Sequence, residues 1–432
     1  MKQNLVSKSL SNRDGRLYIG DWSASELAAL YGTPLYVMDE DLIRENCRAY
    51  RESLEQYYGG NGLVCYASKA FCCKQIYRII REEGLGADCV SLGELYTALA
   101  TGFDPADICY HGNNKTRAEL KALLTEGVGR IVCDNLDELR LLDILAGEAG
   151  VTPKILLRIT PGISAHTHAF IQTGQLDSKF GFAIEGGYAM EAARLAASLP
   201  NLNFAGVHCH IGSQIFDVDP FELAAQVMID FMADCAAEGI ILTECDLGGG
   251  YGIRYTEHDD PVDYGAYMGN VSEVLHRRAA EKGIKPPFII LEPGRSIVGS
   301  AGTTLYEVGS CKEVPGGKKY LSVDGGMTDN IRVALYQAEY TYYAADKLNE
   351  PDTEHYTIAG RCCESGDLLG EVDLPKMDPG DILAAAATGA YCFSMSSNYN
   401  RVLRPGVLFV SEGELYMGVE PQSWEDLMRG DN

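Results

Sequence analysis

The chain has 432 residues and a formal net charge of −25 at pH 7, because 61 Asp and Glu residues outnumber 36 Lys and Arg residues. This acidic balance argues against nucleic acid or an anionic membrane as a partner, since both attract a basic face. With 46% hydrophobic and 22% charged residues, the composition also excludes a largely disordered chain. Residues 1–16 are polar and lack an apolar signal core, and no apolar run reaches the ~18 residues that cross a bilayer, so we expect a cytoplasmic protein.

Short apolar runs alternate with helical patterns through the middle of the chain. Eight runs are predicted as strands, at 63–68, 87–91, 107–111, 130–134, 154–160, 204–210, 242–247 and 288–291. Strict alternation of strand and helix predicts parallel pairing with right-handed crossovers. Eight such units over about 240 residues predict a (β/α)8 TIM barrel. An open doubly wound sheet is the alternative, and the missing nucleotide fingerprint makes it less favoured.

The pattern changes after about residue 300. Short runs bounded by Pro, Gly and Asp follow at 304–314, 319–323, 357–361, 368–372, 381–387 and 407–410. They have little helical periodicity and predict a C-terminal antiparallel β-sandwich or β-barrel domain. Runs at 17–19 and 35–37 are expected to add strands to it. We therefore predict two domains: the barrel at 37–299, and a β domain formed by 1–36 plus 300–432.

The 14 cysteines are scattered and include no Cys-x-x-Cys pair. Many fall inside apolar runs, where Cys behaves as a small hydrophobic residue. Structural zinc requires clustered thiolates at short spacing. We expect reduced thiols and no metal site.

Polar residues at the carboxyl ends of barrel strands are candidates for the site, because the βα loops converge there. The first strand leads into Lys69, whose expected partial desolvation favours the neutral amine needed for a Schiff base. The sixth strand carries His208 and His210, which alternate strand geometry places on one face. This pair suits either a metal ion or a ring stacked on a cofactor.

The last two strands complete a set of four parts. The seventh runs into Gly248–Gly250, whose backbone N–H groups can hold a phosphate. The eighth ends at Glu292, with Arg295 close by. An amine, a covering ring, a phosphate loop and a carboxylate are the parts that pyridoxal phosphate (PLP) requires. The sequence therefore predicts PLP as the cofactor.

Six motifs resemble the alanine-racemase-like, fold-type III family of PLP-dependent decarboxylases, which includes ornithine, arginine and diaminopimelate decarboxylases. They are YASKA (66–70), HCHIGSQ (208–214), LGGGYG (247–252), EPGRSIV (292–298), CESGD (363–367) and GAY (389–391). Further pieces are similar to the diaminopimelate decarboxylases within that family: HGNNK (111–115), the HTH, TGQ and KFGF segments of 166–182, and SMSSNYN (394–400). The resemblance covers nearly the whole chain, in order.

The resemblance implies roles for individual residues. Lys69 would form the Schiff base, and Cys363 would act in protonating the product carbanion. The implied cofactor-binding residues are Lys69, His210, Ser213, Gly249, Gly250, Glu292, Gly294, Arg295 and Tyr391, with Glu292 on the pyridine nitrogen. The implied substrate-binding residues are Arg295, Arg332, Tyr336, Glu364 and Tyr391. Asp88 and Glu94 match supporting acidic positions, and the role of His208 is open.

The implied reaction is decarboxylation of meso-2,6-diaminopimelate to L-lysine and CO2, the last step of lysine biosynthesis. A mixed Arg and Glu site suits a distal end that carries both a carboxylate and an ammonium group. In this family Cys363 and Glu364 would reach the site of the other subunit, so a homodimer is implied.

Three alternatives remain at this point. The substrate could be another basic amino acid or carboxynorspermidine. A metal-dependent hydrolase using His208 and His210 would need further ligands. A non-catalytic binding protein is disfavoured by the presence of Lys69, Cys363 and Glu292 together.

Overall fold

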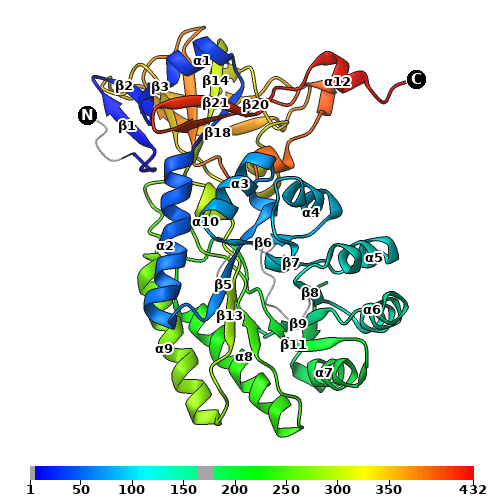
Figure 1. The fold of residues 1–432 in the computed structure, drawn as a ribbon. Coiled ribbons are helices and arrows are strands. Elements are labelled where there is room, and N and C mark those ends of the chain that lie inside the picture. Colours follow the sequence, from blue (N-terminus) through cyan, green and yellow to red (C-terminus); the bar gives the residue numbers. More distant parts are fainter. Residues whose placement is uncertain (1–4, 164–178) are drawn as a thin grey trace. The chain divides into compact units, whose positions relative to one another are not determined.

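The computed structural model describes residues 5–163 and 179–432, which fall into two compact units (Figure 1). The first unit comprises Met1–Asn46, Ile253–Asp260 and Arg295–Asn432, and the second comprises Cys47–Gly252 and Pro261–Gly294. The chain passes between the units four times, so each unit is assembled from separate stretches of sequence.

Eight of the described strands in the second unit close into a parallel barrel. They are β5 (Gly62–Ala67), β6 (Gly86–Cys89), β7 (Ile108–Tyr110), β8 (Arg130–Cys133), β9 (Lys154–Thr160), β11 (Asn203–His208), β12 (Glu244–Asp246) and β13 (Phe288–Leu291). Each strand pairs in parallel with the next, and β13 pairs with β5 to close the ring. The short strand β10 (Phe182–Ala183) adds to the side of β9.

Helices follow the barrel strands in alternation. They are α3 (Lys74–Glu82), α4 (Leu92–Leu99), α5 (Arg117–Glu126), α6 (Leu136–Ala149), α7 (Tyr188–Ser198), α8 (Asp219–Ala237) and α9 (Tyr264–Lys282), while α2 (Glu40–Tyr58) precedes β5. Local sequence sets their ends. The side chains of Thr116 and Asn135 accept backbone N–H groups at the starts of α5 and α6, and both helices end at a left-handed glycine, Gly127 and Gly150.

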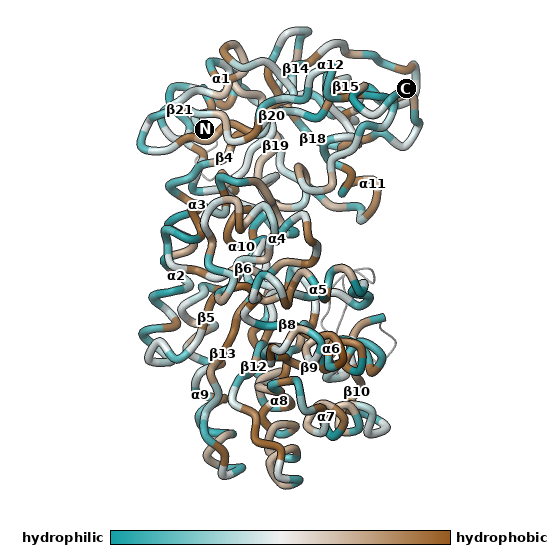
Figure 2. Tube along the Cα trace, turned by 45° about the vertical axis from the view of Figure 1, so that its right-hand side comes forward, coloured by the Kyte–Doolittle hydropathy of each residue, from teal (hydrophilic) through white to brown (hydrophobic). Residues whose placement is uncertain are grey.

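The barrel interior is apolar below its mouth. Cys65, Cys109, Val132, Leu156 and Ile290 are at most 1% exposed and form one cluster with Ala205. Strand β13 is a continuous hydrophobic run in Figure 2. Such continuous runs are typical of parallel strands, because side chains fill one face and helices cover the other.

The first unit consists of two sheets. Strands β1 (Leu10–Arg13), β2 (Arg16–Ile19) and β3 (Trp22–Ser23) form a small antiparallel sheet. The larger sheet contains β4 (Leu35–Asp39), β14 (Gly302–Glu313), β15 (Lys319–Val323), β16 (Tyr342–Ala344), β17 (Glu354–Ala359), β18 (Leu368–Leu374), β19 (Ile382–Ala386), β20 (Gly406–Ser411) and β21 (Glu414–Val419). Helices α1 (Ala24–Tyr31), α10 (Arg295–Val298), α11 (Arg332–Tyr336) and α12 (Trp424–Met428) belong to the same unit.

The predicted fold class is confirmed. All eight predicted barrel strands are present, and the runs at 17–19 and 35–37 lie in β2 and β4. The large sheet differs from a purely antiparallel one, because β15 pairs in parallel with β17 and β4 pairs in parallel with β20. Among the helices of residues 5–163 and 179–432, none has both the length and the apolar composition needed to cross a membrane.

Candidate functional site

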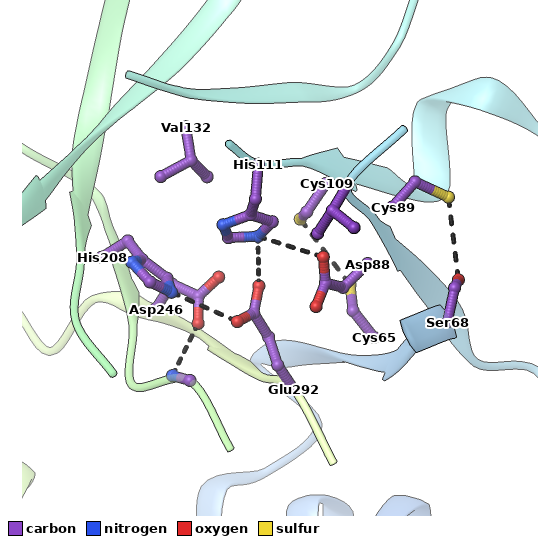
Figure 3. A network of polar contacts seen from close by, with 12 residues as sticks. Cys65, Ser68, Asp88, Cys89, Cys109, His111, Val132, His208, Asp246 and Glu292 are labelled. Carbon is purple, nitrogen blue, oxygen red and sulfur yellow. Dashed lines mark hydrogen bonds and ion pairs between the residues drawn. The ribbon is translucent and has the colours of Figure 1, made fainter. Parts of the chain in front are cut away.

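Buried polar side chains gather at the carboxyl ends of the barrel strands (Figure 3). Asp88 comes from β6, His111 follows β7, His208 ends β11, Asp246 ends β12 and Glu292 follows β13. All five are at most 7% exposed. One donor atom from each of four of them, all except Asp88, lies within 4.8 Å of the other three. Five strands therefore direct titratable groups into one small volume.

Glu292 is the centre of this cluster. Its Oε1 lies 2.5 Å from Nε2 of His111, and its Oε2 lies 3.2 Å from Nε2 of His208. Burial by itself would raise the pKa of Glu292, but the two histidines outweigh burial and hold the pKa well below its ordinary value. Glu292 is therefore an ionised carboxylate in a buried place.

His208 donates to Glu292 as a neutral ring. Burial lowers the pKa of His208 to about 3, against the opposing influence of Glu292, so the ring carries no charge at neutral pH. The contact with a carboxylate assigns the single ring proton to Nε2. Nδ1 is buried and has no hydrogen-bond partner among the described residues.

The two aspartates of the cluster behave differently from Glu292. Burial raises the pKa of Asp88, and the nearby His111 and Lys69, which lower it, only partly offset this effect. Burial raises the pKa of Asp246 well above its ordinary value, and the neighbouring Glu292 charge raises it further. Asp246 Oδ1 accepts the backbone N–H of Gly248 at 2.8 Å. The negative charge of the cluster is thus concentrated on Glu292.

The glycine loop after β12 has no room for side chains. A Cβ added at Gly249 would lie 2.1 Å from the carbonyl oxygen of Glu292, and one at Gly250 would lie 2.4 Å from that of Gly212. Gly248 has a φ of +68°, in the left-handed region that favours glycine. The loop therefore packs directly between the ends of β11 and β13 and presents backbone rather than side chains there.

His210 is oriented by this loop. The backbone N–H of Gly249 donates to Nδ1 of His210 at 3.3 Å. Loss of solvation, and then the charges of Lys69 and Arg158, lower the pKa of His210 well below its ordinary value. The ring is consequently neutral, as a ring that covers an aromatic cofactor should be. Ser213, two residues before the bridge residue Ile215, is half-buried in the loop that follows β11.

Lys69 lies directly after β5, in the short 3-10 turn Ser68–Ala70, and is exposed. The expected partial desolvation is wrong for this side chain, because the turn carries it out of the strand. Its charge acts on Asp88 and His210, whose pKa values it lowers, so it faces the cluster. A Cβ on Gly294 would lie 2.9 Å from that of Ala67, which shows how closely the ends of β13 and β5 approach.

The cluster offers ligands that a metal could use, but the structure favours another assignment. His111, His208, Asp246 and Glu292 have suitable donor atoms. The Nε2 atoms of both histidines already face Glu292 oxygens, that of His208 in a hydrogen bond and that of His111 in a close ion-pair contact. His210 is not part of this group of four.

In the first unit, two buried arginines share tyrosine hydroxyl groups. The guanidinium of Arg295 donates to the hydroxyl of Tyr255. Nη1 of Arg332 donates to the hydroxyls of Tyr255 at 3.1 Å and Tyr340 at 2.6 Å. The ring of Tyr391 lies 4.8 Å from the Arg295 guanidinium carbon and 5.8 Å from that of Arg332. Three of the predicted site residues, Arg295, Arg332 and Tyr391, are therefore together.

The remaining predicted residues of the first unit lie at or near its surface. Cys363 and Glu364 are exposed, and Tyr336 is half-buried in α11. Asp367 holds the loop of Cys363 by accepting the backbone N–H groups of Cys362 at 2.7 Å and Met327 at 2.6 Å. The HTH and TGQ motifs at 166–168 and 173–175 lie outside the described residues.

Sequence reasoning missed four residues of these two clusters. His111 and Asp246 stand at the carboxyl ends of predicted strands, so the rule that selected Lys69 and Glu292 would have found them. No sequence signal pointed to Tyr255 or Tyr340. Their importance lies in contacts with arginines, and Tyr255 lies 77 residues from Arg332 in the chain.

The donor set of the barrel mouth fits PLP. A carboxylate kept ionised, a neutral ring and a backbone loop with no space for side chains match the pyridine nitrogen, the ring face and the phosphate. A family model described as "Pyridoxal-dependent decarboxylase, pyridoxal binding domain" matches residues 40–299. The fold and this site together define a pyridoxal-dependent decarboxylase.

Individual relatives narrow the class. The chain is 47% identical to the diaminopimelate decarboxylase of Bacillus subtilis over 429 residues, covering 99% of this chain and 98% of the relative. It is 42% identical to the Staphylococcus aureus enzyme of the same name, covering 97% and 98%. The diaminopimelate decarboxylase of M. jannaschii, solved with L-lysine, superposes with a TM-score of 0.91 at 34% identity and 99% coverage of both chains. The Helicobacter pylori enzyme, also with L-lysine, gives 0.86 at 31% identity, covering 94% and 98%.

The chain therefore belongs to the diaminopimelate decarboxylase family and is a PLP-dependent carboxy-lyase.

Proposed function

We propose that the enzyme decarboxylates meso-2,6-diaminopimelate to L-lysine and CO2, the last step of lysine biosynthesis. The observation that carries its chemistry is the buried Glu292 carboxylate, which two histidines keep ionised at the barrel mouth. The choice of substrate is supported by relatives of the same name along the full length of the chain. A cytoplasmic location remains a prediction from the sequence.

The proposed cofactor-binding residues belong to both units, and all except Arg295 and Tyr391 lie in the second. They are Lys69, His210, Ser213, Gly249, Gly250, Glu292, Gly294, Arg295 and Tyr391. When bound, PLP supplies an electron sink that stabilises the carbanion left by loss of CO2. Glu292 suits the pyridine nitrogen, because an ionised carboxylate favours protonation of the nitrogen that it contacts. The exposed Lys69 amine is accessible for covalent attachment.

The proposed substrate contacts are divided by charge. Arg295 and Arg332 offer paired N–H donors, which suit a planar carboxylate. Tyr336 and Tyr391 line the same proposed pocket. Glu364 would receive the distal ammonium group of the substrate, which attracts a carboxylate.

We further propose a homodimer in which Cys363 and Glu364 act at the active site of the partner subunit. Their exposure in a single chain supports this proposal, since a side chain that serves a partner must be accessible. Cys363 would supply the proton that completes the product. Asp367, which holds this loop, would fix the position of both residues.

The proposed domains are a PLP-binding barrel at 37–299 and a β domain formed by 1–36 plus 300–432. The family-model match to residues 40–299 supports the first boundary pair. The β domain would contribute Arg332, Cys363 and Glu364 to substrate binding and to the dimer interface.

The proposal is tested by incubating the purified chain and PLP with a panel of amino acids and measuring CO2. We expect release from meso-diaminopimelate, and none from ornithine, lysine or carboxynorspermidine. A Lys69→Ala variant should lose activity and should release PLP on dialysis, with loss of the visible absorbance. CO2 from ornithine alone, or full cofactor retention and activity in Lys69→Ala, would contradict the proposal.

A further inference from the structure

Behind the Glu292 carboxylate lies a layer of side chains to which the proposed function gives no role. His111 contacts Glu292 more closely than His208 does, at 2.5 Å against 3.2 Å. The two histidines differ in how their backbone is held. His208 is part of β11, which pairs with β9 and β12, whereas His111 begins the loop that follows β7 and has one strand bond, from its backbone N–H to the carbonyl oxygen of Cys89 at 2.9 Å. The orientation of His111 therefore depends on this bond and on what holds the rest of the loop.

The anchor is a buried ion pair. Nζ of Lys115 donates to the carbonyl oxygens of Gly112 at 2.9 Å and Val132 at 2.6 Å, and to Oε1 of Glu138 at 2.8 Å. Three acceptors satisfy all three protons of an ammonium group. The Lys115 and Glu138 side chains are 1% and 3% exposed. The loop is thus tied to β8 and to the first turn of α6.

Among the described residues, the hydrogen bonds of Lys115 go to Gly112, Val132 and Glu138, none of which is a proposed site residue. Burial raises the pKa of Glu138, and Lys115 opposes this by stabilising the carboxylate. Replacing such a buried pair with apolar residues often leaves stability unchanged or improves it, so stability alone does not explain its presence. The two bonds to loop and strand carbonyls point to a positional task, namely fixing the segment that starts at His111.

We propose that His111 is a positioning residue that orients the Glu292 carboxylate, and that the Lys115–Glu138 pair fixes the loop carrying His111. This inference rests on the proposed function, because it explains how the chain prepares Glu292 for the pyridine nitrogen. A residue that orients a ligand-binding group through a hydrogen bond commonly changes affinity or activity by about 10- to 100-fold at metal sites, and the same physical argument applies here.

Among the charged and titratable groups around Glu292, the two histidines are the ones placed to orient its carboxylate. The groups that act on it or on its immediate neighbours are His111, His208, Asp88, Asp246, Cys65, Cys109, Lys69 and Arg158. The pKa values of Asp88 and Asp246 are raised, as are those of the two thiols, so these groups favour their uncharged forms. Among the described residues, only the two histidines are within ion-pair distance of Glu292.

The first experiment measures PLP affinity of the full chain after cofactor removal, by absorbance titration. We expect His111→Leu to weaken PLP binding by about 10-fold or more, since the close polar contact that orients an ionised carboxylate is lost. In the reconstituted enzyme, kcat should fall while KM for the substrate stays within about twofold, because no substrate contact is removed. Lys115→Met should act in the same direction, and Lys115→Arg should restore part of the affinity by keeping a cationic donor.

A control variant removes a partly buried ion pair, whose Lys347 and Asp381 side chains are 19% and 26% exposed. Nζ of Lys347 donates to the carbonyl oxygen of Lys376 at 2.9 Å and to Oδ2 of Asp381 at 2.5 Å in the first unit. Lys347→Met should leave PLP affinity unchanged, whereas a general loss of stability would weaken both variants alike. Wild-type affinity in folded His111→Leu and Lys115→Met would overturn the proposal.

The second experiment uses the cofactor-free chain, so it is independent of the proposed function. The ring nitrogens of the eight histidines are labelled with 15N and their chemical shifts recorded. Glu292→Gln should shift the signals of His111 and His208, and Lys115→Met should shift that of His111 alone. Failure of the wild-type chain to bind PLP or release CO2 would refute the proposed function and leave this readout intact. An unchanged His111 signal in Glu292→Gln would overturn the inference, even if His111→Leu fails to fold.

Discussion

A single carboxyl group carries the charge of the barrel cluster because its neighbours differ. Glu292, Asp88 and Asp246 are all buried, and burial raises the pKa of each. Only Glu292 has two imidazoles in contact, and they outweigh burial. Groups whose environments separate their pKa values in this way are common at functional sites. The result is one carboxyl group whose pKa is lowered, beside two whose pKa values are raised.

His208 should make the folded chain less stable in mild acid. The pKa of His208 is about 3 in the folded chain against an ordinary 6.5. Between pH 6.5 and pH 3, His208 therefore binds a proton in the unfolded chain but not in the folded chain. Stability is therefore fully present above pH 6.5 and is lost as the pH falls toward 3, by up to about 1.4 kcal/mol per pH unit. His208→Asn should flatten this slope in urea unfolding. The exposed His355→Asn serves as control, and parallel slopes for His208→Asn and wild type would contradict the prediction.

Arg332 tests the nature of the distal end of the substrate. It is buried and donates to Tyr255 and Tyr340. Arg332→Ala should raise KM for meso-diaminopimelate by about 10- to 100-fold, since a charged hydrogen bond contributes about 1.5–3 kcal/mol. Arg194→Ala, which breaks an exposed ion pair with Glu238 in the second unit, should not change KM. An unchanged KM in Arg332→Ala would indicate a substrate without a distal carboxylate.

The glycine loop after β12 links backbone packing to the site. Gly249 faces the carbonyl oxygen of Glu292 so closely that even a methyl group requires the two strand ends to separate. The same glycine donates its N–H to His210. A change in the loop therefore disturbs both the Glu292 backbone and the orientation of the His210 ring.

Gly249→Ala should lower stability by about 1–3 kcal/mol, as overpacking of a close contact does. It should also weaken PLP binding, because both neighbours of the loop belong to the proposed cofactor site. Gly93→Ala is the matched control, since Gly93 lies in α4 and a Cβ there would meet nothing nearer than 3.6 Å. That change should be neutral or slightly stabilising. Thermal unfolding measures the stability of both variants, and absorbance titration measures their PLP affinity. Equal stability and equal PLP affinity of Gly249→Ala and Gly93→Ala would refute the prediction.

The secondary structure was largely predictable from sequence because barrel strands are periodic and end at clear signals. The runs at 154–160 and 288–291 coincide with β9 and β13. Strand β16 (Tyr342–Ala344) was missed because three residues are too few to show a period. The parallel pairs of the large sheet could not be foreseen either, since pairing depends on how distant strands meet.

The candidate site was predictable where function depends on position along a strand. Lys69, His208 and Glu292 follow from the rule that barrel loops converge at the carboxyl ends. The exposure of Lys69 does not follow from it, because the direction of one side chain is set by the turn after β5. The bridging role of Tyr255 depends on two guanidinium groups brought together by folding.

At the scale of the whole molecule, the proposed site residues come from both units. The second unit supplies Lys69, His210 and Glu292, and the first supplies Arg332 and the exposed Cys363 loop. The chain enters the first unit at Ile253, after the glycine loop, and again at Arg295, three residues after Glu292. The stretch that begins three residues after Glu292 carries both proposed substrate-binding arginines, Arg295 and Arg332.

If active sites are shared in a homodimer, two inactive variants should complement each other. Lys69→Ala disables the barrel of its own subunit, and Cys363→Ala disables the site of its partner. Each homodimer should be nearly inactive, whereas heterodimers have one intact site. Random mixing of equal amounts gives half heterodimers, so about a quarter of the wild-type activity should return.

The matched control for this experiment combines Lys69→Ala with Glu292→Gln. Both residues belong to the same barrel, so every heterodimer carries one defect in each site and no activity should return. Heterodimers are prepared by co-expression with two different affinity tags and assayed for CO2 release from meso-diaminopimelate. Recovery with Cys363→Ala but not with Glu292→Gln assigns Cys363 to the partner's site. Equal absence of recovery in isolated heterodimers would place Cys363 at the site of its own subunit and remove the reason for a shared-site dimer.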